Sequence, residues 1–206
     1  MGMRVLVACE SSGVVREAFR KRGHDAWSCD LLPADDGSPH HIQGDALEVI
    51  MRGWDLVISH PPCTYLCSSG LHWNKRRPER EESTQNAALF FLEVVRRCNS
   101  FARSWAIENP VGCMSRLYRR PDQYVQPYEY GDDASKRTCL WLHNLMPLRP
   151  TRFVTPRLVD GKPRYANQTD SGQNKLPPSK DRSKLRSKTY QGIADAMAEQ
   201  WTQPKR

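Results

Sequence analysis

The sequence predicts an α/β fold in which an open, mainly parallel sheet carries helices on both faces. Short apolar runs alternate with segments of helical periodicity through the first part of the chain. Strand–helix–strand order of this kind requires crossover connections, which make the strands parallel. The chain has 206 residues, 38% of them hydrophobic, which is enough for one domain with a real core.

The individual elements follow from short-range patterns. Strands are expected where brief runs are rich in apolar and β-branched residues, at residues 3–8, 24–30 and 54–59 and from Trp105 onward. Helices are expected where apolar residues recur on one face, at residues 14–23, 44–53 and 82–101. In the longest of these, one stripe is expected to face the core: Ala88, Phe91, Leu92 and Val95.

The character of the chain changes at Tyr124. Residues 125–145 indicate two β segments joined by a polar turn, an antiparallel finish to the sheet. Residues 149–188 are rich in proline, arginine and lysine and show little periodicity, so an extended loop is expected there. We therefore predict a core at 1–148, a basic, proline-rich extended loop or reduced recognition segment at 149–188, and a C-terminal helix at 189–206 that packs back on the core.

Composition narrows the class of protein. No apolar run approaches the ~20 residues of a membrane-spanning helix, and a soluble cytoplasmic protein without membrane contact is expected. Seven scattered cysteines, an odd number, indicate a reducing compartment rather than a disulfide framework. The net charge of +8 is concentrated at residues 73–80 and 173–188, which suggests a polyanionic partner such as nucleic acid, although a solvated basic loop explains it equally well.

Four polar features fall at the expected carboxyl ends of strands. They are the turn Cys9–Gly13, Asp30, the turn around Cys63, and Glu108–Pro110. In open α/β sheets, ligands bind beyond the carboxyl ends of the strands. The four features are therefore expected to meet on one rim of the sheet.

The first turn and Asp30 indicate a nucleotide-type cofactor. A turn of small residues lets a ligand approach the start of a helix, and a carboxylate roughly 20 residues on can bind ribose hydroxyls. The stretch CESSG lacks the repeated glycines of a dinucleotide fingerprint, which favours a cofactor without pyrophosphate, such as S-adenosylmethionine. Asp45 either contributes to adenine binding or caps the helix that follows it.

A thiol follows two prolines at the end of the third strand, in the stretch SHPPC. Proline fixes φ, so the pair would present Cys63 at the sheet edge, where a thiolate can act as a nucleophile. The alternative is a small buried hydrophobe, which is the role expected of Cys67. A metal site at His60, Cys63, Cys67 and His72 is not favoured, because the paired short spacings of zinc sites are missing.

The stretch DLVISHPPC, followed by IENP, resembles motifs of the DNA (cytosine-5)-methyltransferase family. In particular the chain resembles short phage-type cytosine methyltransferase-like proteins, and the likeness continues through KRTCLWLHNL to TYQGIADAMAEQW. The resemblance implies a Rossmann-like methyltransferase fold, S-adenosylmethionine as cofactor, and methylation of carbon 5 of cytosine in DNA, in a bacterial or phage-infected cell.

The resemblance also implies roles for individual residues. Cys63 would add to carbon 6 of cytosine, with Pro62 beside it, and Asn109 would orient the neighbouring loop. Glu108 would stabilise the activated base at ring nitrogen 3, which requires a carboxyl that is protonated or shares a proton with the base. The residues implied for the cofactor are Glu10, Ser11, Gly13, Asp30, Asp45 and Pro61. Apart from the resemblance, the basic segments are expected to bind the phosphates of a nucleic acid through Lys75, Arg76, Arg77, Lys136, Arg137, Lys180, Arg182 and Arg186.

The chain departs from the family at several positions. His60 stands where the family commonly has glycine, and Thr64 where it has glutamine. In the basic motif, Lys136 stands at the first arginine position, while Ala134 and Thr138 replace the glutamine and the second arginine. Only about 45 residues separate this motif from the final helix, too few for an independent recognition domain.

These departures leave the substrate open. Duplex DNA is expected in preference to single strands, with the target base out of its stack. Trp73 or Tyr65 either stacks on that base or belongs to the hydrophobic core. A specificity partner or a homodimer would compensate for the short recognition segment. The alternatives are a non-catalytic nucleic-acid-binding protein with the same fold, and an enzyme that modifies free cytidine nucleotides.

Overall fold

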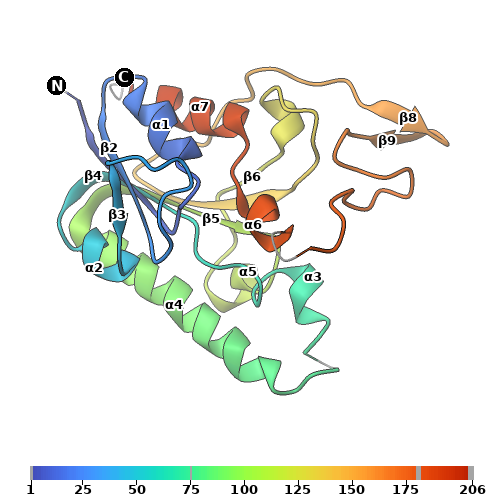
Figure 1. Cartoon of the computed structure of the whole chain (residues 1–206), viewed down its shortest axis with the longest axis horizontal. Helices are drawn as coiled ribbons and strands as arrows, with labels where there is room; N and C mark the ends of the chain where they lie inside the picture. The colour runs from blue at the N-terminus through green and yellow to red at the C-terminus, as the bar shows by residue number, and fades with distance from the viewer. Residues whose placement is uncertain (1, 75, 180–181, 204–206) are drawn as a thin grey trace.

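The fold consists of a seven-stranded sheet with helices on both faces and a long segment between the last sheet strand and the last helix (Figure 1). This segment, residues 149–179 and 182–188, carries a small hairpin and is called the arm. The computed structural model describes residues 2–74, 76–179 and 182–203. The sheet strands are β1 (Arg4–Ala8), β2 (Asp25–Asp30), β3 (His41–Gln43), β4 (Trp54–Ser59), β5 (Ala102–Pro110), β6 (Gln123–Val125) and β7 (Thr138–His143). The hairpin strands are β8 (Arg157–Val159) and β9 (Lys162–Arg164). The helices are α1 (Val14–Arg20), α2 (Ala46–Ile50), α3 (Ser68–Leu71), α4 (Arg80–Phe101), α5 (Met114–Leu117), η1 (Pro127–Glu129), α6 (Arg182–Ser187) and α7 (Gln191–Gln200).

The order of strands in the sheet creates a crevice near its centre. The order is β3-β2-β1-β4-β5-β7-β6. Strands β1 to β5 are parallel, and β7 runs antiparallel to both β5 and β6. The predicted open, Rossmann-like sheet with an antiparallel finish is therefore confirmed. Because the chain passes from β1 outward to β3 and then returns to β4 on the other side of β1, the switch point for ligand binding lies between β1 and β4.

The sheet is rigid because its central strands are buried on both faces. In β1, Val5 and Val7 join a cluster with side chains of α1 and α7, whereas Leu6 and Ala8 join a second cluster with side chains of α2 and α4. All four side chains are fully buried. Figure 1 shows α1 and α7 side by side on one face and α4 crossing the other. This packing fixes the strand ends from which the loops of the site emerge.

Most of the expected elements of residues 1–124 are present, and β4 has the bounds that the sequence predicts. The stripe on α4 needs a correction. Ala88, Phe91 and Val95 are buried as expected, but Leu92 is 36% exposed and Val94 is fully buried in its place. The sequence pattern did not identify the side of the helix that meets the sheet, because apolar residues are nearly continuous from residue 87 to residue 95.

The region after residue 124 differs more from expectation. The stretch around Tyr128, predicted as part of a strand, is the short helix η1, which begins at Pro127. Residues 149–188, predicted as an extended loop, contain the β8–β9 hairpin and α6. The hairpin turns at Asp160 and Gly161, whose φ angles of 50° and 72° are the left-handed values that a type I′ turn requires. Asp-Gly is a hairpin signal, so the sequence did contain the information.

Two further expectations concern the chain as a whole. All seven cysteines are free thiols. Within the described ranges, no helix is both long enough and apolar enough to span a membrane.

Candidate active-site cleft

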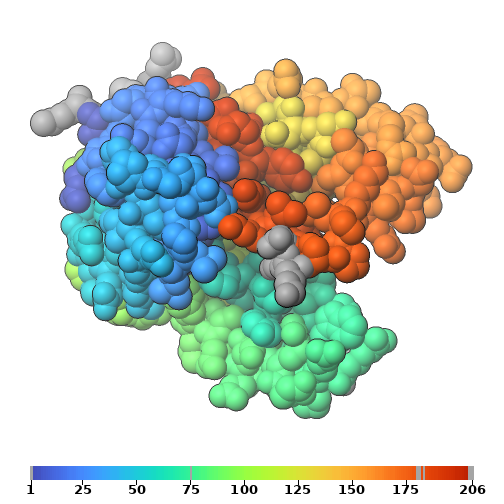
Figure 2. Space-filling model, viewed as in Figure 1, coloured from blue at the N-terminus to red at the C-terminus, as the bar shows by residue number. Residues whose placement is uncertain are grey.

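A cleft of about 1170 Å³ opens along the carboxyl edge of the sheet. It is lined by residues that follow β1, β2, β4 and β5, by the loop before β7, and by the segment containing α6. Figure 2 shows the N-terminal part of the chain, the arm and the α3–α4 region coming together on this face. Single small-ligand sites usually have ~300–1,000 Å³. The cleft is therefore large enough for two ligand groups.

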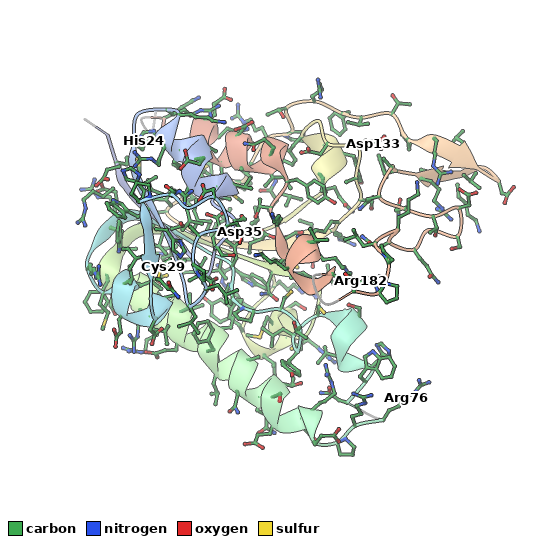
Figure 3. All side chains as sticks on the ribbon, viewed as in Figure 1. His24, Cys29, Asp35, Arg76, Asp133 and Arg182 are labelled. Atoms are coloured by element: carbon green, nitrogen blue, oxygen red, sulfur yellow. The ribbon has the colours of Figure 1, made fainter. Side chains whose placement is uncertain are left out.

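The cleft brings together most of the residues that the sequence singled out. Those that line it are Glu10, Ser11, Asp30, Pro61, Pro62, Cys63, Arg77, Glu108, Asn109, Lys136, Arg137, Arg182 and Arg186. Gly13, Asp45 and Arg76 are not part of the lining. Figure 3 shows Arg76 on the connection between α3 and α4, at the periphery of the molecule. Lys75 and Lys180 lie outside the described residues.

Glu10 holds the turn that follows β1. Its carboxylate accepts hydrogen bonds from the backbone N–H groups of Val15 at 2.9 Å and Arg16 at 3.4 Å, and from the Ser12 hydroxyl at 3.1 Å. These N–H groups belong to the first turn of α1, where backbone N–H groups have no acceptor within the helix. Gly13 precedes the helix with φ of 72°, and a Cβ there would meet the Arg16 guanidinium. Glu10 therefore fixes the shape of the turn between β1 and α1.

Asp45 is a helix cap. Its Oδ1 accepts the N–H of Leu47 at 2.8 Å at the start of α2. This is the capping alternative that the sequence left open. Asp30 differs from it, because Asp30 lines the cleft while its Oδ1 accepts the N–H of Leu32 at 3.0 Å.

The loop between β2 and β3 is held from two sides by ion pairs. Arg16, which is wholly buried, donates from its guanidinium to Asp36. On the other side, Asp35 forms ion pairs with Lys184 Nζ at 2.6 Å and Lys188 Nζ at 3.5 Å. Figure 3 shows Asp35 beside α6, which the pairs tie to this loop. The contact of Arg16 was not predicted, because an arginine on an amphipathic helix normally faces solvent.

The turn after β4 directs Cys63 into the cleft. Asn109, which is buried on β5, donates from Nδ2 to the carbonyl oxygen of Pro61 at 2.8 Å and so ties the proline pair to the neighbouring strand. The Cys63 carbonyl accepts the N–H groups of Leu66 and Cys67, both at 3.0 Å. Burial and then Cys67 raise the pKa of the Cys63 thiol, and Lys136 opposes them. Cys63 is therefore a thiol at neutral pH in the free protein.

Glu108 is paired with His60. The distance between Glu108 Oε2 and His60 Nδ1 is 3.0 Å, and the Thr189 hydroxyl donates to the same oxygen at 3.3 Å. Burial by itself raises the pKa of Glu108, but the charge and hydrogen bond of His60, followed by Lys136 and Thr189, outweigh it and lower the pKa to about 2. The expected role needs a carboxyl that is protonated or shares a proton with the base, whereas this low pKa favours an ionised Glu108 in the free protein.

His60 connects strands β1 and β5 at the carboxyl edge of the sheet. Its N–H donates to the Ala8 carbonyl on β1 at 2.9 Å, and its side chain reaches Glu108 on β5. Burial lowers the pKa of His60, but Glu108 and Glu10 raise it more than burial and Lys136 lower it. Nε2 is buried and has no hydrogen-bond partner within the described part of the chain. The sequence marked His60 only as a departure from the family pattern.

Basic and aromatic residues form the outer rim of the cleft. Trp73 lines the cleft at 40% exposure, and the guanidinium groups of Arg76 and Arg77 lie 5.5 and 5.8 Å from the centre of its ring. Tyr65, the other expected stacking residue, lies under Arg80 and is not part of the lining. Further cations of the rim are Arg80, Lys136, Arg137, Arg182, Lys184, Arg186 and Lys188.

A metal centre was not expected, and the described residues contain no group of three or more histidine, cysteine or acidic side chains placed to bind one. The ring of His72, one member of the group considered from the sequence, packs on Trp73 with 4.9 Å between ring centres.

Comparison with known proteins finds similarity at the level of structure. No family model and no curated protein matches the chain. Among solved structures, it is similar to the methyltransferase EhMeth of Entamoeba histolytica, with 12% sequence identity and a TM-score of 0.49. The match covers 75% of this chain and 58% of the other. The chain thus spans well under two thirds of the length of EhMeth.

Proposed function

We propose that the protein is an S-adenosylmethionine-dependent methyltransferase that acts on carbon 5 of cytosine in DNA. The observation that carries the proposal is that Cys63 and Glu108, from loops after different strands, line one cleft together with Ser11 and Asp30. The stretches HPPC and IENP, in which the two residues occur, support the same function. The size of the cleft allows a cofactor and a base to lie in it together.

The inner end of the cleft fits the cofactor. Ser11 and Ser12 provide a turn of small residues, Asp30 a carboxylate suited to ribose hydroxyls, and Leu32 an apolar surface for a base. When bound there, S-adenosylmethionine supplies an electrophilic methyl group. Pro61, which Asn109 holds in place, also lines the cleft and would lie against the cofactor.

The other end of the cleft activates the base. Carbon 5 of cytosine is too weakly nucleophilic to take a methyl group unaided. The Cys63 thiolate adds to carbon 6, and the displaced π electrons move through carbons 5 and 4 toward nitrogen 3, where Glu108 stabilises them. After carbon 5 has gained the methyl group, loss of its proton restores the double bond between carbons 5 and 6 and expels the thiolate.

The rim of the cleft suits a nucleic acid. The target base of a duplex must leave its stack to reach Cys63. The cations of α6 and of the loop before β7 would bind phosphates, and Trp73 offers an aromatic face to an unstacked base.

A labelled-cofactor panel tests the function. The protein is incubated with S-adenosylmethionine tritiated on the methyl group and with duplex DNA, single-stranded DNA, RNA or deoxycytidine nucleotides. We expect label in DNA, in 5-methylcytosine. Label only in free nucleotides would contradict the DNA assignment. The absence of both label and S-adenosylmethionine binding in calorimetry would leave a non-catalytic nucleic-acid-binding protein.

A further inference from the structure

The ion pair between His60 and Glu108 poses a problem for the reaction. Nitrogen 3 of cytosine becomes strongly basic when a thiolate adds to carbon 6, and a nearby proton stabilises the product of that addition. Glu108 by itself has no proton to give, because its partners keep it ionised. The proton must come from a group in contact with Glu108.

We propose that His60 holds this proton on Nδ1 and passes it through Glu108 to nitrogen 3 as the bond between Cys63 and carbon 6 forms. His60 acts through another side chain and is therefore a positioning residue in the reaction. The inference rests on the proposed function and names the proton source for the same site.

The position of His60 supports this role. Its Nδ1 lies 3.0 Å from Glu108 Oε2, which is hydrogen-bond distance. The backbone of His60 is fixed by its bond to Ala8, and the proline pair restrains the chain immediately after it. His60 and Glu108 both line the cleft, so the pair borders the space that a base would occupy.

The second ring nitrogen provides independent support. A buried N–H without a partner costs roughly 1–3 kcal/mol, and no described residue accepts from Nε2. Asn109 Oδ1, also buried in the cleft lining, likewise lacks a partner within the described ranges. His60 Nε2 is a donor when the ring is protonated, and Asn109 Oδ1 is an acceptor. Hydrogen bonds to a bound ligand would explain why neither atom has a protein partner.

The proton balance closes over one cycle. Cys63 enters as thiolate, its proton having passed to solvent. As the S–C6 bond forms, nitrogen 3 takes a proton from Glu108 while Glu108 takes the Nδ1 proton, which leaves His60 neutral. When the carbon 5 proton is lost to solvent and the thiolate departs, the proton on nitrogen 3 returns by the same route.

The charged groups around His60 determine the direction of the pH effect. Glu108 on β5 and Glu10 after β1 raise the pKa of His60, whereas burial and Lys136, before β7, lower it, and the net direction is upward from 6.5. His60 is therefore protonated below its raised pKa and loses its proton as the pH rises through it. Methyl transfer should lose the contribution of His60 on that alkaline side.

Two variants and two readouts test the inference. His60→Asn removes the proton source. His143→Asn is the control, because that exposed ring lies at the end of β7 and stacks on Trp105, away from the cleft lining. In His60→Asn we expect kcat at pH 7.5 to fall about 100-fold, and the remaining activity to shift toward acidic pH, where Glu108 itself becomes protonated. His143→Asn should keep the wild-type rate and pH profile.

The second readout needs no substrate. Nitrogen-15 NMR of histidine-labelled protein should show His60 titrating above pH 6.5 in the wild type and at clearly lower pH in Glu108→Gln, where only Glu10 still opposes the effect of burial on the pKa of His60. This measurement uses Glu108→Gln, so the inference can still be tested if His60→Asn fails to fold.

The outcomes separate the two proposals. If the wild type transfers methyl groups and His60→Asn has the same rate and pH profile, the inference about His60 is wrong but the proposed function stands. A His60 titration that is unchanged in Glu108→Gln leads to the same conclusion. A wild type without any methyl transfer overturns the proposed function and with it the destination of the proton, while NMR still shows whether His60 and Glu108 share one.

Discussion

Glu10 and Glu108 are both buried glutamates at the carboxyl edge of the same sheet, yet their partners are of different kinds. Glu10 accepts two backbone N–H groups at the start of α1 and a serine hydroxyl. Glu108 is held by an imidazole and a threonine hydroxyl. Backbone N–H groups cannot change protonation in the working pH range, whereas an imidazole can.

This difference suggests different tasks for the two carboxylates: one maintains the structure of the cleft, and the other takes part in the proposed reaction. The Glu10 carboxylate holds the start of α1 in place. In the proposed reaction, the Glu108 carboxylate belongs to a pair that can move a proton, and Cys63 forms a covalent bond with the base. The predictions below test this division.

The largest effect is expected at Cys63. Cys63→Ala removes the nucleophile and should lower methyl transfer at least about 1,000-fold, with the fold retained. Cys67→Ala removes the neighbouring thiol, which the proposed reaction does not use, and the variant should still form the covalent intermediate. Initial rates with tritiated cofactor measure both. Turnover in Cys63→Ala comparable with the wild type would exclude covalent catalysis by this residue.

The two glutamates should respond differently to the same substitution. Glu108→Gln keeps the shape but removes the proton route and should lower kcat about 100- to 1,000-fold. Glu10→Gln weakens the bond between a carboxylate and a helix start, so its main effect should be a loss of about 1 kcal/mol in the free energy of unfolding. Urea unfolding and initial rates together check the contrast. The division fails if Glu10→Gln reduces kcat as strongly as Glu108→Gln does.

The free energy of unfolding at acidic pH should show the contribution of the ion pair between His60 and Glu108. The folded pKa of Glu108, about 2, lies below its ordinary value of 4.5, so its stabilisation is present above pH 4.5 and is lost as the pH falls toward 2. The loss amounts to about 3 kcal/mol at most. In Glu108→Gln, burial leaves His60 neutral when folded, so stability should fall already below about pH 6.5. Unfolding free energies from pH 3 to 8 test this, and parallel curves for the two proteins would contradict it.

The smallest effect concerns the rim. Arg77→Ala should weaken binding to duplex DNA a few-fold and reduce the slope of log Kd against log salt by about 1. Arg96→Ala is a matched control, because Arg96 is exposed on α4, paired with Glu93 at 2.7 Å and outside the cleft lining. Fluorescence anisotropy at several salt concentrations gives both slopes. Equal slopes in the two variants would remove Arg77 from the binding surface.

The sequence predicted those parts of the fold that depend on local patterns. The apolar run of β4 is bounded by Gly53 and by His60 with its proline pair, so both of its ends could be predicted. The convergence of Asp30, Cys63 and Glu108 followed from the rule that parallel strands end on one edge. Helix α6 was missed because its residues show little periodicity, and the ion pairs of Lys184 and Lys188 with Asp35 that tie this segment to the core leave no local pattern.

The partners within the site could not be predicted in the same way. His60 and Glu108 are 48 positions apart in the chain, and Thr189 follows Glu108 by 81. No local pattern records such contacts. A usable signal existed at His60, where a titratable residue ends a strand that is otherwise buried. Buried polar groups need partners, and that requirement could have directed attention to the carboxyl end of the next strand.

The most direct test of the account is to locate the covalent bond. A duplex containing 5-fluorocytosine prevents release of the enzyme, because the fluorine at carbon 5 cannot leave as a proton does. After incubation with S-adenosylmethionine, digestion and mass spectrometry should find the nucleotide attached to Cys63. An adduct on another cysteine, or methylation of ordinary cytosine without any trapped species, would contradict the account.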